Sequence, residues 1–259
     1  MTTTHDLDLP RRTLLKASLG AGAALLLPSG LALAGTPTPT QTEGPFHPLQ
    51  QRRTSTGEIV RVDQRIRKDV DRDADLTFTS DNPGTAYGTP VEVTVRVLSA
   101  AGPGLTDRAL ANADVELWQA CASGRYNHRS DPSREWLDPN FQYWGKGRSD
   151  AQGNVRFKTV VPGAYLAGGS WVRPPHIHVR ASAAGHRELT SQWYFEGVRF
   201  YYNNRMWSAD ELRTLNGRDQ VLSAVPLEQR ADVIARVRRV GTGAAATNHA
   251  SYTLRLAPR

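Results

Sequence analysis

The chain has 259 residues, of which 39% are hydrophobic and 22% charged, and this supplies enough apolar material for one large β-rich domain or two small ones. Its 22 Gly and 16 Pro are spread among six Trp, eight Tyr and six Phe, which argues against a disordered chain. The formal net charge is +7, but the basic residues are dispersed along the sequence, which predicts at most a mild attraction for anionic substrates and no nucleic-acid binding.

Residues 1–34 have the pattern of an export signal. A polar stretch leads to the pair Arg11-Arg12, an apolar run follows over residues 17–33, and the small residues of Ala32-Leu33-Ala34 fit a signal-peptidase site. The paired arginines resemble the twin-arginine signal of bacteria. Glycines and a proline interrupt the apolar run, which favours cleavage over a retained anchor. We therefore expect a periplasmic or secreted protein with no stable membrane insertion.

Residues 35–81 are predicted to form a linker and an extended arm. Residues 35–42 are rich in Thr and Pro and carry no hydrophobic periodicity, so we expect them to be mobile. One short apolar alternation follows at residues 59–62. From residue 82 to residue 259 no change in composition divides the chain, and we expect a single domain there.

The hydrophobic pattern of this domain has the period of two that is typical of half-buried strands. The predicted strands cover residues 91–97, 113–120, 154–160, 176–181, 191–195 and 252–256. Turn residues separate them, which favours mostly antiparallel strands with long loops, in a sandwich or a barrel. A capping box at Ser208–Glu211 predicts one short helix, and a second is expected after Pro226. The fold class is therefore all-β.

A pair of histidines, His176 and His178, is the sharpest local feature. Residues i and i+2 of a strand point to the same face with Cα atoms about 7 Å apart, so the two imidazoles could hold one metal ion. The preceding Pro174-Pro175 cannot donate to a sheet and places the pair at the start of a strand or at a sheet edge. On this pattern alone, two surface or hydrogen-bonded histidines remain an open alternative.

The sequence limits which other ligands could join the histidines. Cys121 is the only cysteine, which excludes both an internal disulfide and a Cys/His zinc site. Two tyrosines, Tyr126 and Tyr165, follow glycine-containing turns. Phenolate is a hard anionic ligand, and a trivalent iron would stabilise this deprotonated form of a group whose ordinary pKa is near 10.

Several motifs, in a fixed order along the chain, resemble the intradiol ring-cleavage dioxygenases, most closely the protocatechuate 3,4-dioxygenase group. The matching segments are Thr42–Phe46, Val115–Ala120, Gly124–His128, Asp138–Phe141, Pro162–Tyr165, Trp171–His178 and Gln192–Gly197. The resemblance covers residues 42–200 well and the C-terminal 60 residues weakly. It implies a β-sandwich that carries the site on loops and short helices.

The resemblance also implies a mononuclear non-haem Fe(III) site. Tyr126 would be the equatorial tyrosinate and Tyr165 the axial one that the substrate displaces. His176 and His178 would be the equatorial and axial histidines. An enzyme of this family inserts both atoms of O2 into a catechol-type ring, such as protocatechuate, catechol or a related compound, and gives a cis,cis-muconate-type diacid.

Two further residues match positions that contact or line the substrate site in the family, Arg173 beside the bound ring and Gln192 in the lining. The chain departs from the protocatechuate type at Ala167, where members of that group commonly carry tryptophan. Gly168-Gly169 follows, so the pocket wall is expected to be wider. The departure leaves recognition of a ring carboxylate, and hence the substrate, open.

Two other functions remain as alternatives. One is a secreted, non-catalytic β-sandwich binding protein, and the other is a cupin-like Fe(II) or Mn(II) enzyme that would add His128 or His186 to the metal site. The sequence leaves the oligomeric state open, including a homo-oligomer. It also leaves open whether Phe46 and His47 line the site.

Overall fold

The structure is a computed structural model that describes residues 35–53, 59–63, 73–80, 82–102, 105–243 and 246–259. The predicted export signal, residues 1–34, lies outside these residues and stays a prediction. None of the helices in the described residues has the length and apolar content needed to cross a bilayer.

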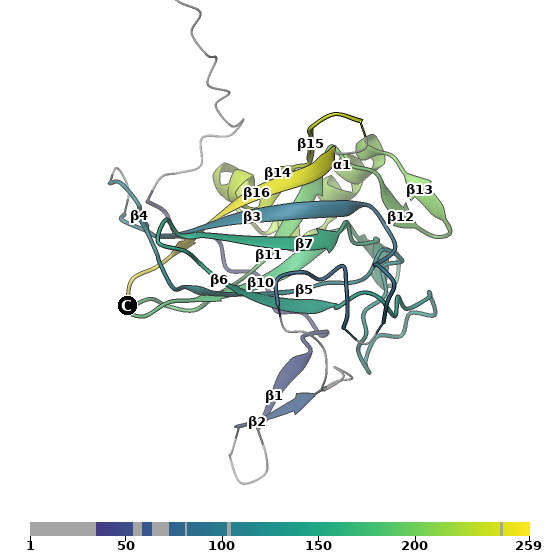
Figure 1. The fold of residues 1–259 in the computed structure, drawn as a ribbon, viewed down its shortest axis with the longest axis horizontal. Coiled ribbons are helices and arrows are strands. Elements are labelled where there is room, and N and C mark those ends of the chain that lie inside the picture. Colours follow the sequence, from purple (N-terminus) through teal and green to yellow (C-terminus); the bar gives the residue numbers. More distant parts are fainter. Residues whose placement is uncertain (1–34, 54–58, 64–72, 81, 103–104, 244–245) are drawn as a thin grey trace, which may run out of the picture.

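Two five-stranded sheets face each other across an apolar core (Figure 1). The first sheet is organised around β3 (Pro90–Ser99), in which alternate residues from Val91 to Val97 are buried, as its sequence period predicts. Its other strands are β4 (Arg108–Ala109), β7 (Asn154–Val160), β15 (Arg238–Val240) and β16 (Thr247–Leu256). The strand β3 pairs with β4, β7 and β16, and β15 pairs with the outer side of β16.

The second sheet has the strand order β14-β11-β10-β5-β6. Its strands are β5 (Asp114–Trp118), β6 (Trp144–Arg148), β10 (His176–Ser182), β11 (Leu189–Glu196) and β14 (Ile234–Arg236). Two pairs, β3 with β16 and β11 with β14, are parallel, and the other pairs of the two sheets are antiparallel. The predicted all-β sandwich of mostly antiparallel strands is therefore confirmed.

The strand β10 departs from the half-buried alternation that its sequence predicts. Ile177 and Val179 face the core, but His176 and His178 on the opposite face are buried as well. His176 is the first residue of the strand, as the preceding prolines predict, and the strand lies in the middle of its sheet, between β5 and β11, and not at an edge. Both faces are covered, which excludes water from the two histidines.

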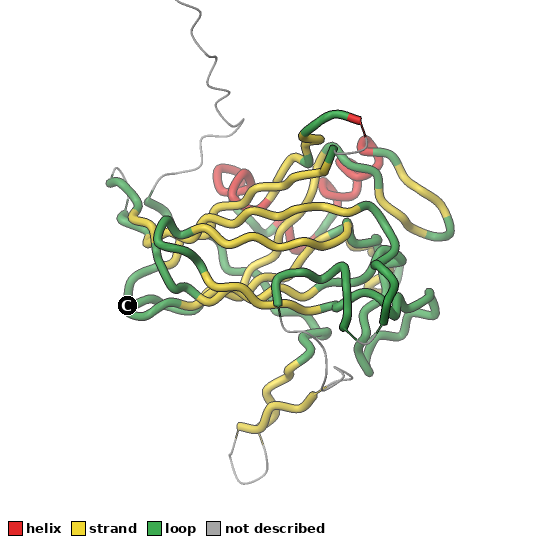
Figure 2. The backbone as a smooth tube through the Cα atoms, viewed as in Figure 1, coloured by secondary structure: helices red, strands yellow, loops and turns green. Residues whose placement is uncertain are grey.

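Three hairpins and a few short helices complete the described fold (Figure 2). The hairpins are β1 (Leu49–Arg53) with β2 (Ile59–Asp63), β8 (Tyr165–Gly168) with β9 (Trp171–Arg173), and β12 (Phe200–Tyr202) with β13 (Arg205–Trp207). The helices are α1 (Ala209–Arg218), α2 (Gln220–Ser223), the 3-10 helix η1 (Leu227–Gln229) and α3 (Arg230–Val233). The predicted capping box of α1 is present, since Ser208 and Glu211 each cap the other's backbone N–H.

The predicted mobility of residues 35–42 is wrong for the part of this segment that contacts the sheets. The backbone N–H of Thr38 donates to the carbonyl of Arg255 at 3.0 Å, and that of Gln41 donates to Thr190 at 3.0 Å. Thr38 and Gln41 are both buried. The lack of periodicity reflects an irregular backbone that is fixed by hydrogen bonds to distant strands, which a local pattern does not reveal.

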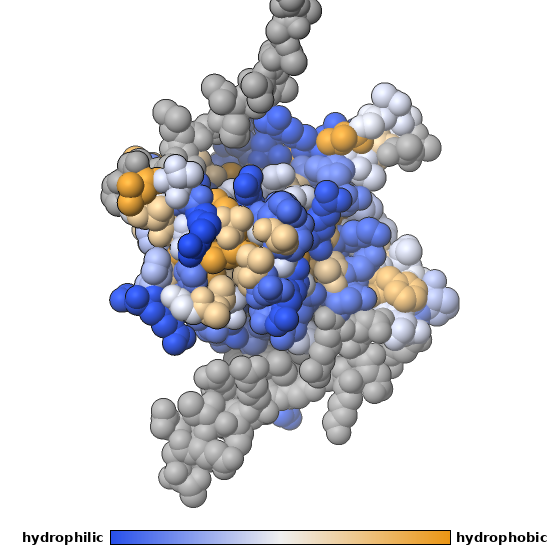
Figure 3. Space-filling model, turned by 60° about the vertical axis from the view of Figure 1, so that its left-hand side comes forward, coloured by the Kyte–Doolittle hydropathy of each residue, from blue (hydrophilic) through white to orange (hydrophobic). Residues whose placement is uncertain are grey.

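The outer surface carries few large apolar side chains. On the face shown in Figure 3, hydrophilic residues alternate with small apolar areas. Single exposed apolar residues of this kind are normal for a folded protein, and the apolar residues of the chain are concentrated between the sheets instead.

Replacement of Leu117 by Ala tests this core. Leu117 of β5 is fully buried between the sheets, so the change should lower the free energy of unfolding by about 2 to 5 kcal/mol. Urea denaturation followed by tryptophan fluorescence measures this loss. The matched change at Leu227, which is 75% exposed, should stay within about 0.5 kcal/mol. Equal losses in the two variants would contradict the placement of Leu117.

Candidate metal centre and substrate cavity

Strand register places three of the predicted site residues, His176, His178 and Gln192, on the outer face of the second sheet. In β10, His178 lies opposite Trp118 of β5 and Gln192 of β11, and His176 lies opposite Tyr194 of β11. Side chains that are directly opposite in neighbouring strands share a face. A histidine pair that alternates with core residues therefore faces away from the core and toward a cluster of aromatic and polar side chains.

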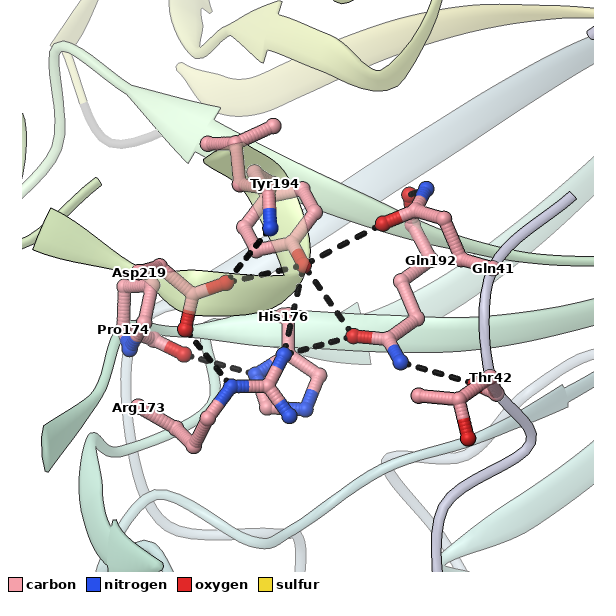
Figure 4. A network of polar contacts seen from close by, with 9 residues as sticks. Gln41, Thr42, Arg173, Pro174, His176, Gln192, Tyr194 and Asp219 are labelled. Atoms are coloured by element: carbon pink, nitrogen blue, oxygen red, sulfur yellow. Dashed lines mark hydrogen bonds and ion pairs between the residues drawn. The ribbon is translucent and has the colours of Figure 1, made fainter. Parts of the chain in front are cut away.

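His176 is held in the state that a metal ligand requires. Its Nδ1 lies 2.7 Å from the carbonyl oxygen of Pro174, which accepts only from an N–H, so this nitrogen carries the proton (Figure 4). Its Nε2 is buried and has no hydrogen-bond partner among the described residues. A histidine that donates one ring N–H to a carbonyl and leaves the other nitrogen bare is the usual arrangement around a protein-bound metal.

His178 stacks on Trp118, with ring centroids 5.0 Å apart and an interplanar angle of 9°. Its Nδ1 is buried and lacks a hydrogen-bond partner among the described residues. Burial lowers the pKa of both histidines well below the usual range, and the nearby charge of Arg173 lowers both further. Both imidazoles are therefore neutral near pH 7, which is the form that binds metals.

The two tyrosines approach the histidines because two turns pack backbone against backbone. Gly124 precedes the loop that carries Tyr126, and at its φ of +87° an added Cβ would lie 2.2 Å from the carbonyl oxygen of Ala164. Ala164 in turn precedes Tyr165, the first residue of β8. The contact leaves the tyrosine rings 5.6 Å apart, at right angles to one another.

The four rings form one cluster. Centroid distances are 4.9 Å for His176–His178, 5.6 Å for Tyr165–His176 and 6.2 Å for Tyr126–His178. The hydroxyl of Tyr126 is buried with no hydrogen-bond partner among the described residues. Several bare polar atoms in one buried cluster carry a large desolvation cost, which a bound cation would offset.

The donor set favours a strongly charged metal ion. Burial raises the pKa of Tyr126 well above its usual value, and the neighbouring Tyr165 raises it further. Burial likewise raises the pKa of Tyr165. Both phenols thus keep their protons unless a cation stabilises the phenolates, and a trivalent ion does so most strongly. The residues fit the Fe(III) site that the sequence predicts.

Arg173 lies beside this cluster in a network that sequence reasoning did not anticipate (Figure 4). Its Nε donates to Asp219 at 2.7 Å, and its Nη2 donates to Gln192 at 2.6 Å and to the hydroxyl of Tyr194 at 3.2 Å. The Tyr194 hydroxyl also lies 3.1 Å from an oxygen of Gln192 and 3.3 Å from one of Asp219. Arg173 is 4% exposed and Asp219 is fully buried, so each charge depends on the other.

Asp219 and Tyr194 are the site residues that the sequence did not reveal as such. Asp219 lies between α1 and α2 and caps the N-terminus of α2, where its side chain accepts from Leu222 N–H. An Asp before a helical segment predicts this cap, but nothing in the local pattern predicts a pairing with a residue 46 positions away. Tyr194 lies two residues after Gln192 on β11 and so points to the same face. This spacing was the signal that could have identified Tyr194 as a site residue.

The arm motif Thr42–Phe46 covers the site. The Thr42 carbonyl accepts from Gln192 Nε2 at 2.8 Å, and Glu43 pairs with Arg180. Gly44 has a φ of +71°, and a Cβ there would lie 3.0 Å from Cε1 of His178. Only glycine therefore allows the arm to pass this closely over the histidine.

The structure answers the two questions that the sequence leaves open about the arm. Phe46 packs 4.7 Å from the ring of Tyr126 and lines the cavity described below. His47 instead lies against the edge of Trp118 at 4.5 Å and contacts Glu116 at 2.8 Å. Phe46 is thus part of the site, and His47 supports the Trp118 ring on which His178 stacks.

A cavity of about 510 Å³ opens beside the ring cluster. Of the six predicted site residues, Tyr165 and Arg173 line it. Gln192 is fully buried behind Arg173, from which its side-chain oxygen accepts a hydrogen bond. Gln192 is therefore placed to orient the arginine rather than to line the cavity itself.

The further histidines of the cupin-like alternative are not part of the four-ring cluster. His186 bonds to Ser99 Oγ at 2.9 Å and to the Ala184 carbonyl at 2.8 Å. His128 packs against Phe46 with ring centroids 5.6 Å apart. Among the described residues, no group of three or more His, Cys, Asp and Glu side chains is arranged to hold a metal, and the cluster around His176 includes two phenols instead.

Comparison with known proteins agrees with the fold and the motifs. The family model Dioxygenase_C, described as dioxygenase, matches residues 66–258. The protocatechuate 3,4-dioxygenase beta chain of Burkholderia cepacia is 42% identical over 130 residues, which are 48% of this chain and 52% of that protein. The chlorocatechol 1,2-dioxygenase of Pseudomonas putida is 32% identical over 109 residues, which are 37% of this chain and 40% of that protein. The chain thus spans about half the length of these relatives or less.

A solved structure matches over a larger share. The intradiol ring-cleavage dioxygenase from Tetranychus urticae superimposes with a TM-score of 0.54 at 19% identity, over 86% of this chain and 95% of that one. At this identity the likeness shows a shared fold. Because the family model covers well over half of the sequence, the chain belongs to the intradiol ring-cleavage dioxygenase family.

Proposed function

We propose that this protein is an Fe(III)-dependent intradiol dioxygenase that converts a catechol-type compound and O2 into a cis,cis-muconate-type diacid. The observation that carries the proposal is the set of bare, buried donor atoms in one ring cluster, which includes His176 Nε2 and Tyr126 Oη. Such atoms are costly without a cation. The proposed ligands are Tyr126, Tyr165, His176 and His178.

The two phenols would have different tasks because their surroundings differ. Tyr126 is 3% exposed and lies beneath Phe46, so it is suited to remain a permanent ligand. Tyr165 lines the cavity and is within reach of a bound catechol. Its phenolate oxygen would accept a proton from a substrate hydroxyl, and its high pKa in the buried state makes it a strong base for this transfer. Bound Fe(III) would supply the Lewis acidity that activates the substrate toward O2.

Arg173 would stabilise the negative charge of the bound ring. It lines the cavity as a permanent cation, and Asp219, Gln192 and Tyr194 hold its nitrogen atoms in fixed positions. A preorganised charge stabilises a developing anion without the cost of reorienting during the reaction. Gln192 would act through Arg173.

The direct test is reaction of the iron-loaded full chain with catechol. The protein should be red-brown from phenolate-to-Fe(III) charge transfer and should consume O2 and catechol in equal amounts, with a ring-opened diacid as product. An oxygen electrode and mass spectrometry with labelled O2 measure this, and both oxygen atoms should enter the product. A colourless iron-replete protein, or one that binds catechol without consuming O2, would contradict the proposal and favour the binding-protein alternative.

Replacement of His178 by Ala should lower the affinity for iron by at least roughly tenfold, because one nitrogen donor is lost and Trp118 cannot replace it. Iron per chain after equilibration with a competing chelator measures the affinity. The control is His249→Ala, since His249 is partly exposed and bonds to Thr247 on β16. Equal iron binding by the two variants would show that His178 is not a ligand.

Replacement of Asp219 by Asn should reduce kcat roughly tenfold while the iron content stays at one per chain, because the Arg173 charge loses its main anchor. It should also lower the free energy of unfolding by about 3 kcal/mol, since a buried cation is left without its anion. Steady-state kinetics and urea denaturation measure the two effects. Asp210→Asn, at an exposed ion pair of α1, is the matched control and should change neither. An unchanged kcat in the Asp219 variant would remove its positioning role.

A further inference from the structure

The cavity beside the ring cluster is larger than an unsubstituted catechol needs, at about 510 Å³. Its outer wall includes Leu166, which is 54% exposed, and Ala167. A Cβ added to the next two residues, Gly168 and Gly169, would meet nothing within 4 Å. Side chains therefore do not close the cavity at these two positions of the β8 side, and a substituent on a bound ring has room to extend there.

The charged residues that line this cavity in the described chain are two carboxylates, Asp131 and Glu135, and one guanidinium, that of Arg173. The guanidinium is already paired with the buried carboxylate of Asp219 at 2.7 Å. A carboxylate on the substrate would be a second anion in the cavity, besides the catechol oxygens. Among the described residues it would find no lining cation without a partner, and it would come close to the carboxylates of Asp131 and Glu135. The electrostatic cost of this approach is largest where water is excluded.

The two carboxylates are held in different ways. Asp131 accepts from the backbone N–H of Tyr126 at 2.6 Å and from that of Ser133 at 2.8 Å, which fixes its charge next to the ligand loop. Glu135 is half-buried, and its carboxylate has no hydrogen bond or ion pair with any residue that the structure describes. Asp131 thus supplies a fixed negative field, and Glu135 is available to a ligand.

Aromatic side chains form much of the remaining wall. Phe46, Tyr165, Trp171 and Tyr202 line the cavity together with the two carboxylates. An ammonium group is stabilised both by carboxylates and by the faces of aromatic rings, whereas a carboxylate is repelled by the first and gains nothing from the second. The lining as a whole therefore suits an apolar substituent or a cationic one.

We propose that this cavity selects catechols whose ring substituent is uncharged or carries an ammonium group, and that it discriminates against catechols with a carboxylate on the ring or on a short side chain. This inference rests on the proposed function, because it assumes that the catechol hydroxyls face the ring cluster around Tyr165. The net charge of +7 predicts a mild attraction for anionic substrates. The proposed preference is the opposite, because the cavity lining carries two carboxylates and one guanidinium.

The test compares three catechols of nearly equal size with the iron-loaded full chain: 4-(2-aminoethyl)catechol, 4-ethylcatechol and 3,4-dihydroxyphenylacetate. The kcat/KM for the ammonium compound should exceed that for the carboxylate by at least about fivefold at low ionic strength, with 4-ethylcatechol between them. The difference should shrink in 0.5 M salt, because screening weakens the interaction with partly exposed carboxylates.

The variant Glu135→Gln connects the selectivity to the cavity. It should reduce the ratio of kcat/KM for the ammonium compound to that for 4-ethylcatechol by about threefold, because one of the two lining carboxylates is lost. Glu228→Gln is the matched control, since Glu228 is exposed on η1 and does not line the cavity, and it should leave this ratio unchanged.

A binding measurement separates this inference from the proposed function. Tyramine and 4-hydroxyphenylacetate are monophenols that a ring-cleaving enzyme cannot open, and calorimetry measures their binding to the metal-free protein. Tyramine should bind at least about threefold more tightly, and Glu135→Gln should remove most of that preference. If no catechol is cleaved but tyramine is preferred, the proposed function fails and the charge preference stands. If 4-ethylcatechol is cleaved and the carboxylated compounds are equal to the ammonium compounds or better, the preference is overturned and the function stands.

Discussion

The buried ion pair between Arg173 and Asp219 connects the parts of the molecule that make the site. Arg173 comes from β9, at the edge of the β8–β9 hairpin, and Asp219 comes from the junction of α1 and α2. Gln192 and Tyr194 extend the network to β11, and the Thr42 carbonyl extends it to the arm. A buried charge that lost any of these partners would be left partly unsatisfied, so the hairpin, the helices, the sheet and the arm are constrained to one arrangement.

The same network lets the outer face of the second sheet exclude water although it is polar. The outer face of the second sheet carries imidazoles, amides, a guanidinium and phenols where a water-exposed sheet would carry scattered polar residues. Two apolar clusters pack against it, one that contains Phe46 and Trp118 and one in which Leu222, Val225 and Val233 pack with Tyr194. Because the local dielectric constant is low, each fixed charge acts over a longer range than it would in water. This strengthens the effect of Arg173 on the pKa values of the two histidines and the effect of the cavity-lining carboxylates on a ligand.

Sequence reasoning identified the parts of this structure that depend on local pattern. The alternation of Val91 to Val97 predicted β3, and the spacing of His176 and His178 correctly placed both rings on one face. The short hairpins β8–β9 and β12–β13 have too few residues for a period to show, and β6 contains two glycines. Asp219 and the packed segment around Gln41 depend on partners 46 and about 150 residues away. Long-range pairing leaves no local trace, so the motif resemblance named Gln192 but not Asp219 and Tyr194, the other two groups that hold Arg173.

The contacts of the arm have a consequence for how the protein is made. Thr38 and Gln41 are among the first described residues to be synthesised, yet their hydrogen-bond partners are Arg255, 217 residues later, and Ser191, 150 residues later. At a ribosomal rate of about 5 to 20 residues per second, the interval before Arg255 emerges is roughly 10 to 40 seconds. During this interval Thr38 lacks its partners Thr253 and Arg255, whereas Gln41 and Thr42 can already bond to Ser191 and Gln192. The arm can thus cover the histidine face once β11 has been made, and its first residues are fixed only when β16 has been made.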